Sequence, residues 1–131
     1  MVGVGFNLGL LSACFLKSCK SVEYYLGFQE KTNNFYSPRL GFCNVKNNYK
    51  GDKDICVGST ATLAEKLGVR EWDLAIVNEE LGFDRHLFYL DLLWQHLSPD
   101  GMIVAESIKR HPPAQEAFFS FCECKNRARL V

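Results

Sequence analysis

The fold prediction rests on one apolar run, Trp72-Asp73-Leu74-Ala75-Ile76-Val77. Short runs of this kind are typical of strands in parallel sheets, which helices cover on both faces. A helical pattern follows over residues 83–97, where apolar side chains recur every three or four positions. Proline and glycine then predict a turn at 98–101, before a second buried strand at 102–105. This order predicts two parallel strands joined by a helical crossover.

The same alternation continues on both sides of this unit. Strands are predicted at 22–28 and 54–58, and helices at 9–19, 61–67 and 114–124. We therefore expect an α/β fold: a Rossmann-like open, mostly parallel sheet with helices on both faces. Within the helix at 83–97, Trp94 is expected in or near the core and His86 at the surface.

Residues 1–131 are expected to form a single domain, because no linker divides the chain. Residues 29–52 differ in composition from the rest, being rich in Asn, Lys, Tyr and Gly without any hydrophobic period. Such a segment is typical of a long connection, so a loop-rich insertion is predicted there. Residues 127–131 are expected to open one more strand.

Composition excludes several classes of function. The 131 residues include 15 basic and 15 acidic side chains and have a formal net charge of +0. A balanced chain lacks the one-sided field of a non-specific nucleic-acid binder, so no nucleic-acid partner is expected. The 6 cysteines show no CxxC spacing. Free thiols in a reducing, cytoplasmic setting are therefore predicted.

The amino-terminal residues leave open the alternative that the protein is an exported lipoprotein. Residues 2–16 are nearly all apolar or small, and Leu11-Ser12-Ala13-Cys14 is similar to the cleavage box of a bacterial lipoprotein. A secretory signal has basic residues before its apolar stretch, whereas the first basic residue here is Lys17. The run is also too short to span a bilayer, so no membrane partner is expected.

A glycine-rich stretch, Gly3-Val4-Gly5-Phe6-Asn7-Leu8-Gly9, comes directly before the first predicted helix. Glycines allow a sharp turn and let a ligand approach the backbone, while the start of a helix offers free amide donors. The spacing differs from the dinucleotide fingerprint GxGxxG, because Leu8 stands in place of the third glycine. Small residues in a tight strand-to-helix turn are the alternative interpretation.

Together with later segments, this stretch resembles the class I S-adenosylmethionine-dependent methyltransferase family. The other matching segments are Gly27-Phe28-Gln29, Val57-Gly58-Ser59, residues 72–79, Leu90-Asp91-Leu92-Leu93-Trp94 and residues 97–104. The last two segments are the most specific, and they are most similar to the branch of small-molecule and sugar O-methyltransferases. The resemblance covers residues 2 to about 121, and against the family's pattern the domain is truncated at both ends.

The resemblance implies an S-adenosylmethionine site at the carboxyl ends of the strands. Its implied members are Gly3, Gly5, Phe6, Asn7 and Gly9 for the methionine end, Gln29 for the ribose, Gly58 and Ser59 for the adenine, and Asn78 and Glu79 beside the methyl donor and acceptor. Asn78 and Glu79 are accordingly the candidate catalytic residues. Methyl transfer needs in-line positioning and, for a hydroxyl acceptor, a base or a metal.

Three departures from the family's pattern qualify these roles. The acidic residue before the glycines falls on Met1, so the first strand is expected to be nearly missing. Gln29 stands where the second strand should end in an acid, and Glu30 can substitute only if that strand end bulges. Asn78 replaces the aspartate with which metal-dependent members bind their ion. No metal site is therefore predicted, since hard cations need several oxygen ligands.

The sequence thus predicts methyl transfer from S-adenosylmethionine to an oxygen of a small-molecule substrate. One alternative is a degenerate, non-catalytic methyltransferase-like fragment or interaction domain. Another is an NAD-binding Rossmann domain, which requires a strand before Gly3 and an acid after the second strand.

Overall fold

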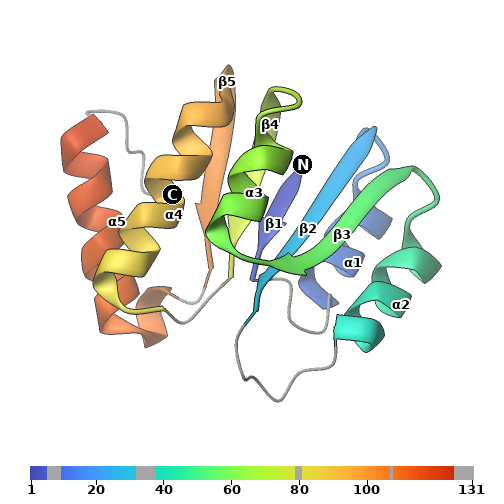
Figure 1. Ribbon diagram of the computed structural model, residues 1–131, viewed down its shortest axis with the longest axis horizontal. Helices are drawn as coiled ribbons and strands as arrows, with labels where there is room; N and C mark the ends of the chain where they lie inside the picture. The colour runs from blue at the N-terminus through green and yellow to red at the C-terminus, as the bar shows by residue number, and fades with distance from the viewer. Residues whose placement is uncertain (6–9, 32–37, 79–80, 107, 126–131) are drawn as a thin grey trace.

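Strands and helices alternate along the chain in the computed structural model, which describes residues 1–5, 10–31, 38–78, 81–106 and 108–125 (Figure 1). The elements are β1 (Val2–Val4), α1 (Leu10–Ser18), β2 (Tyr24–Glu30), α2 (Pro38–Asn48), β3 (Asp52–Gly58), α3 (Thr60–Leu67), β4 (Trp72–Val77), α4 (Phe83–His96), β5 (Leu97–Ala105), a 3-10 turn (Ile108–Arg110) and α5 (Pro112–Lys125).

The strands form one five-stranded sheet in the order β3-β2-β1-β4-β5, and every pair is parallel. This is a Rossmann-like α/β arrangement, which confirms the predicted fold class. β1 has 3 residues but lies at the centre of the sheet, where Gly3 is opposite both Gly27 of β2 and Ile76 of β4. The strand expected to be nearly missing is thus short, yet paired on both sides.

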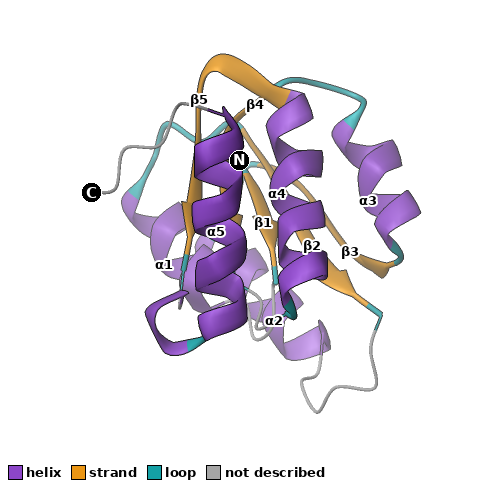
Figure 2. Ribbon diagram, turned by 90° about the vertical axis from the view of Figure 1, so that its left-hand side faces the viewer, coloured by secondary structure: helices purple, strands orange, loops and turns teal. Residues whose placement is uncertain are grey.

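Helices cover both faces of the sheet. Helices α1 and α2 pack together on one face, behind β2 and β3 in Figure 1, and α3, α4 and α5 lie on the other (Figures 1 and 2). Right-handed crossovers explain this division, because the chain moves outward from β1 to β3 and then returns across the sheet to β4 and β5. The helices that follow β1 and β4, α1 and α4, therefore lie on opposite faces of the sheet.

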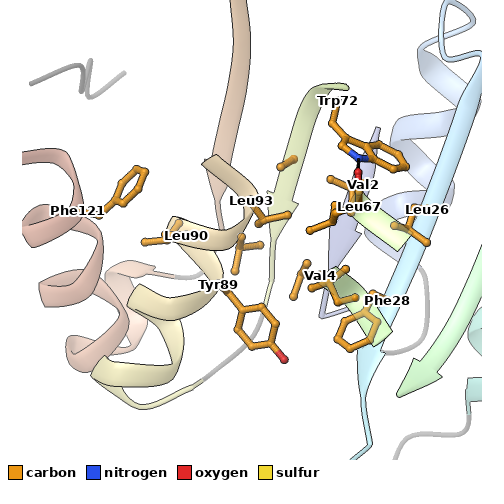
Figure 3. Packing of buried hydrophobic residues seen from close by; sticks show 13 residues of the cluster. Val2, Val4, Leu26, Phe28, Leu67, Trp72, Tyr89, Leu90, Leu93 and Phe121 are labelled. Carbon is orange, nitrogen blue, oxygen red and sulfur yellow. Dashed lines mark hydrogen bonds between the residues drawn. The ribbon is translucent and has the colours of Figure 1, made fainter. Parts of the chain in front are cut away.

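A large hydrophobic cluster fills the space between the sheet and helices α3, α4 and α5 (Figure 3). Alternate strand residues point into it, as the period of a pleated strand requires. Its buried members are Val2, Val4, Leu26, Phe28, Leu63, Leu67, Trp72, Ala75, Val77, Tyr89, Leu90, Leu93 and Phe121. This group is called the large cluster below.

A smaller cluster lies between the sheet and helices α1 and α2. Its buried members are Leu16, Tyr25, Val45 and Tyr49, with Met1, Val22 and Ile55 packed against them. This group is called the small cluster below. It includes a buried hydrogen bond, which the Tyr25 hydroxyl donates to Ser12 Oγ at 2.6 Å.

The predicted insertion at 29–52 is wrong in most of its length. β2 continues to Glu30, α2 occupies Pro38–Asn48, and β3 begins at Asp52. Three asparagines and a glycine within α2 lower its intrinsic helix propensity, which hid the helix in the sequence. Packing against α1 and the burial of Val45 stabilise it instead.

Two further predictions need correction. His86 is fully buried rather than at the surface, on the side of α4 that also presents Tyr89, Leu90 and Leu93 to the core. The turn expected at 98–101 lies inside β5, where four residues stand between Leu97 and Met102 while only Asp73 stands between their partners in β4. This irregularity gives the proline and glycine the bend that they favour.

The prediction that Trp94 lies in or near the core is confirmed. Trp94 is partly buried and packs edge-to-face on Phe121. All 6 cysteines lie in the described residues, and none of them forms a disulfide. No helix in the described part of the chain is long and apolar enough to cross a membrane. The strand expected at 127–131 lies outside the described residues.

Candidate functional site

The carboxyl ends of the strands bring several of the predicted site residues into one row. Backbone bonds extend the sheet by one residue there: Gly5 N–H donates to Phe28 O at 3.1 Å, and Asn78 N–H donates to Val4 O at 2.8 Å. The parallel register places Gln29, Gly5 and Asn78 at the same level of β2, β1 and β4. In open α/β sheets ligands bind at this edge, where the strand order reverses. In this sheet that point lies between β1 and β4.

Gly5 has a backbone conformation that suits a ligand loop. Its φ of 81° falls in the left-handed region, which side chains other than glycine rarely adopt. The turn directs the chain away from the sheet toward α1, which begins at Leu10. Phe6, Asn7 and Gly9, the other residues predicted for this loop, lie outside the described residues.

Gly3 lies inside β1, two residues before that turn, and its environment explains its small size. A Cβ atom at this position would come within 3.0 Å of the Tyr25 hydroxyl oxygen and 3.3 Å of Ser12 Oγ. Glycine therefore makes room for the buried Tyr25–Ser12 hydrogen bond. This packing role explains Gly3 without a ligand, whereas Gly5 is the glycine at the edge.

The end of β2 contains an acid, Glu30, directly after the predicted site residue Gln29. Gln29 is buried and shares the sheet face of Tyr25, whereas Glu30 lies on the opposite face, beside α4. One oxygen of the Glu30 carboxylate pairs with the Arg85 guanidinium, and the other accepts a hydrogen bond from the Tyr89 hydroxyl at 2.9 Å. The strand runs to Glu30 in regular register with β3, so no bulge is needed to bring this acid to the edge.

Gly58 and Ser59 connect β3 to α3, and both have local structural roles. A Cβ atom at Gly58 would lie 3.0 Å from the side chain of Thr62. Ser59 is the N-cap of α3, and its Oγ accepts a long hydrogen bond of 3.4 Å from Thr62 N–H. Serine is one of the residues preferred at this position, because its side-chain oxygen can accept from a free backbone N–H of the first turn. The Ser59 hydroxyl is therefore already in use at the start of the helix.

The fourth and fifth strands place two polar residues side by side at the edge. Asn78 follows β4, and Glu106 N–H donates to Val77 O at 2.8 Å, which brings Glu106 level with Asn78. Glu79, the other candidate catalytic residue, lies outside the described residues. Among the residues that the structure describes, no group of three His, Cys, Asp or Glu side chains could hold a metal ion.

A cavity lies elsewhere, at the amino edge of the sheet. It has a volume of about 420 Å³ and lies between the starts of β2 and β4, next to the end of α1. Of the predicted site residues that the structure describes, none lines it. The carboxyl edge is the better candidate for a nucleotide site, because the strand order and the turn at Gly5 both point there.

No protein-family model matches the sequence, and no curated protein shows significant similarity to it. The site is therefore described by its geometry alone. It consists of a Rossmann-like α/β sheet with a glycine turn after β1 and a glutamate at the end of β2. This arrangement is compatible with nucleotide-binding enzymes.

Proposed function

We propose that the carboxyl edge of the sheet binds S-adenosylmethionine and positions it for methyl transfer to an oxygen of a small molecule. The observation that carries the proposal is the juxtaposition of Gly5, Glu30 and Asn78 around the point where the strand order reverses. The sequence resemblance selects S-adenosylmethionine from the nucleotides that such an edge accepts. When bound, this cofactor supplies an electrophilic methyl group on its sulfonium.

The chain's own residues would bind and orient the cofactor. The turn at Gly5 opens the backbone to the methionine end, and the Glu30 carboxylate accepts hydrogen bonds from ribose hydroxyls. Arg85 and Tyr89 hold that carboxylate in place from α4. A carboxylate has about four acceptor positions, so two protein donors leave room for a diol. Asn78, next to Gly5 in the register, then lies beside the transferred group.

Isothermal titration with S-adenosylmethionine and with S-adenosylhomocysteine tests this proposal directly. We expect Glu30→Gln to weaken both affinities about tenfold to a hundredfold, because hydrogen bonds to a charged acceptor contribute roughly 1.5–3 kcal/mol. Glu23→Gln is the matched control, since Glu23 is exposed and lies directly before the first residue of that strand. Thermal unfolding without ligand, measured for each variant, separates lost binding from lost stability.

Two outcomes would reject the proposal. Absence of heat and of any thermal shift at millimolar cofactor excludes the site, and equal affinities of the Glu30 and Glu23 variants exclude its placement. Binding without transfer to any small-molecule hydroxyl would instead support the non-catalytic alternative. Methyl transfer would be followed with radiolabelled cofactor.

A nicotinamide dinucleotide is the second candidate, and Glu30 is the observation that favours it. An acid at the end of the second strand binds the ribose of NAD in Rossmann domains, and β2 ends in Glu30. The GxGxxG spacing is absent, which favours S-adenosylmethionine. A larger rise in melting temperature with NAD than with S-adenosylmethionine would reverse this order.

A further inference from the structure

Methyl transfer to a hydroxyl needs a group near the reacting atoms that takes the proton of the acceptor. Asn78 cannot do this, because its side chain is an uncharged amide and not a base. Glu106, which follows β5, is exposed and has a carboxylate that can accept a proton. Its position relative to Asn78 therefore bears on the class of acceptor.

Glu106 lies one strand away from Asn78, at the same level. Val77 of β4 and Ala105 of β5 are register partners, and Glu106 N–H donates to Val77 O at 2.8 Å. The pairing of the two strands thus continues to the next residues, Asn78 and Glu106. Neighbouring strands are about 4.8 Å apart, so a single oxygen atom between these two side chains could contact both.

The pleat of β5 places Glu106 on a sheet face that is apolar below it. Ile103 packs against the large cluster, whereas Met102 and Val104 are 60% and 41% exposed. Because side chains alternate along a strand, Glu106 shares its face with Met102 and Val104. Each step between these three residues is about 6.6 Å along the strand.

The neighbouring strand β4 shows the same alternation. Val77 belongs to the large cluster, so Ile76 and Asn78 on either side of it point to the opposite face. Ile76 is the register partner of Val104, as Asn78 is the neighbour of Glu106. Two polar side chains at the carboxyl edge thus continue into an apolar strip. This group is called the β4–β5 strip below, and its members are Ile76, Asn78, Met102, Val104 and Glu106.

The chemistry of the strip selects one kind of acceptor. A carboxylate is a weak base, and a phenol, with a pKa of about 10, gives up its proton far more readily than an aliphatic alcohol. Binding sites for small molecules combine apolar surface with a few polar groups that fix orientation. A flat ring fits the apolar part of the strip, since the side chains of two paired strands form one continuous surface.

We propose that the acceptor is a small phenol, with its ring on Met102 and Val104 and its hydroxyl between Asn78 and Glu106. This inference rests on the methyl transfer proposed above, with the cofactor between β1 and β4. Glu106 accepts the hydroxyl proton and then releases it to solvent. Meanwhile the phenolic oxygen takes the methyl group, and the electron pair of the broken carbon–sulfur bond stays on sulfur. The products are the methyl ether and S-adenosylhomocysteine.

Met102 provides a test of binding that needs no catalysis. The chain has 2 methionines, so methionine labelled with carbon-13 in its methyl group gives one signal for Met1 and one for Met102. We expect 4-ethylphenol to shift the Met102 signal, both alone and with S-adenosylhomocysteine, and to leave the Met1 signal in place at the amino edge. Cyclohexanol, a hydroxyl compound without an aromatic ring, should need a several-fold higher concentration.

Glu106→Gln tests the proton transfer. We expect it to slow methylation of 4-ethylphenol by roughly 10²–10⁴-fold, the usual contribution of a general base. With 4-nitrophenol, which is largely ionised at mildly alkaline pH, the loss should be less than about tenfold, because no proton has to be removed. Glu123→Gln, at an exposed position of α5, is the matched control.

The outcomes separate this inference from the proposed function. An unshifted Met102 signal, or equal half-saturation by 4-ethylphenol and cyclohexanol, overturns the phenol site. Equal losses with the two phenols, or no loss in Glu106→Gln, overturn the role of Glu106 while leaving methyl transfer intact. A parent protein that binds the phenol at Met102 but no cofactor would reject methyl transfer and keep the phenol site.

Discussion

The two faces of the sheet are built in different ways. On one face, three helices cover a cluster of thirteen buried side chains, nearly all of them aliphatic or aromatic. On the other face, two helices cover a cluster of four, and the strands contribute Gly3, Gly27 and the hydrogen-bonded Tyr25. The first face is stabilised by the quantity of apolar surface buried, and the second by the fit of a few specific groups.

This difference predicts how the faces respond to mutation. Removing a side chain from the large cluster costs the transfer free energy of its atoms and leaves a cavity. On the small-cluster face, adding a single methyl group or removing a single hydroxyl should matter, because a buried polar group tolerates little change around it. Measurements of stability for substitutions on each face therefore test this difference.

Truncation of Trp72 should have the largest effect. Its ring is buried in the large cluster, and its Nε1–H donates to Leu67 O at 3.0 Å, which ties β4 to α3. Trp72→Ala should lower the free energy of unfolding by about 3–5 kcal/mol in urea denaturation. Trp72→Phe keeps much of the ring and should cost less than half as much. Equal losses in the two variants would mean that the hydrogen bond, and not packing, dominates.

Gly3→Ala should be the most costly addition on the small-cluster face. Its new Cβ atom would approach the Tyr25 hydroxyl oxygen to 3.0 Å, so overpacking of about 1–3 kcal/mol is expected. A double-mutant cycle with Tyr25→Phe supplies the control, because removal of that hydroxyl relieves the closest contact. Costs that simply add would show that Gly3 and Tyr25 act separately, and the packing role of Gly3 would then be wrong.

Tyr25→Phe should lower stability by about 1 kcal/mol at neutral pH, since it removes the hydrogen bond to Ser12. Burial raises the pKa of Tyr25 above its ordinary value of 10.0, so the folded state keeps the phenol protonated. Above that pH the unfolded chain loses the proton first, and stability should fall by up to about 1.4 kcal/mol per pH unit.

Urea denaturation between about pH 9 and 11.5, around the ordinary tyrosine pKa, measures this slope. The Tyr25→Phe variant should lose stability less steeply than the parent above pH 10, the ordinary pKa of the phenol, although other tyrosines contribute to both curves. Tyr24→Phe is the comparison, since Tyr24 is only partly buried. Identical alkaline slopes for the parent and the Tyr25 variant would contradict the burial of the phenol.

Ser59→Ala should have the smallest effect, about 0.5 kcal/mol, because the capping hydrogen bond of 3.4 Å is long. Ser18→Ala, at an exposed position of α1, is the control for loss of a serine hydroxyl. If Ser59 acts only as a cap, the affinity for S-adenosylmethionine should stay within twofold of the parent. A tenfold loss of affinity would assign its hydroxyl to the adenine.

Much of the fold could be predicted from local patterns. The apolar run that became β4 and the spacing of leucines in α4 each carried enough signal alone. α2 could not be predicted in this way, because its stability comes from packing against α1 rather than from its own residues. The burial of His86 could have been predicted, since its spacing of three, four and seven residues from Tyr89, Leu90 and Leu93 places all four on one helical face.

Less of the candidate site than of the fold could be predicted from the sequence. The sequence pattern predicted which residues lie at the carboxyl ends of the strands, but not toward which face of the sheet each side chain points. Gln29 and Glu30 are adjacent in sequence, and a strand period of two sends them to opposite faces. Only the position of α4 shows that Glu30 meets Arg85 and Tyr89.

The sequence by itself determined the alternation of strands and helices, because hydrophobic periodicity and turn residues act over a few neighbouring positions. The tertiary structure decided which residues meet: Gly3 against the Tyr25 hydroxyl, Glu30 beside α4, and the starts of β2 and β4 around a cavity. These contacts join residues distant along the chain, and their geometry depends on strand order and register. No local pattern encodes either of these.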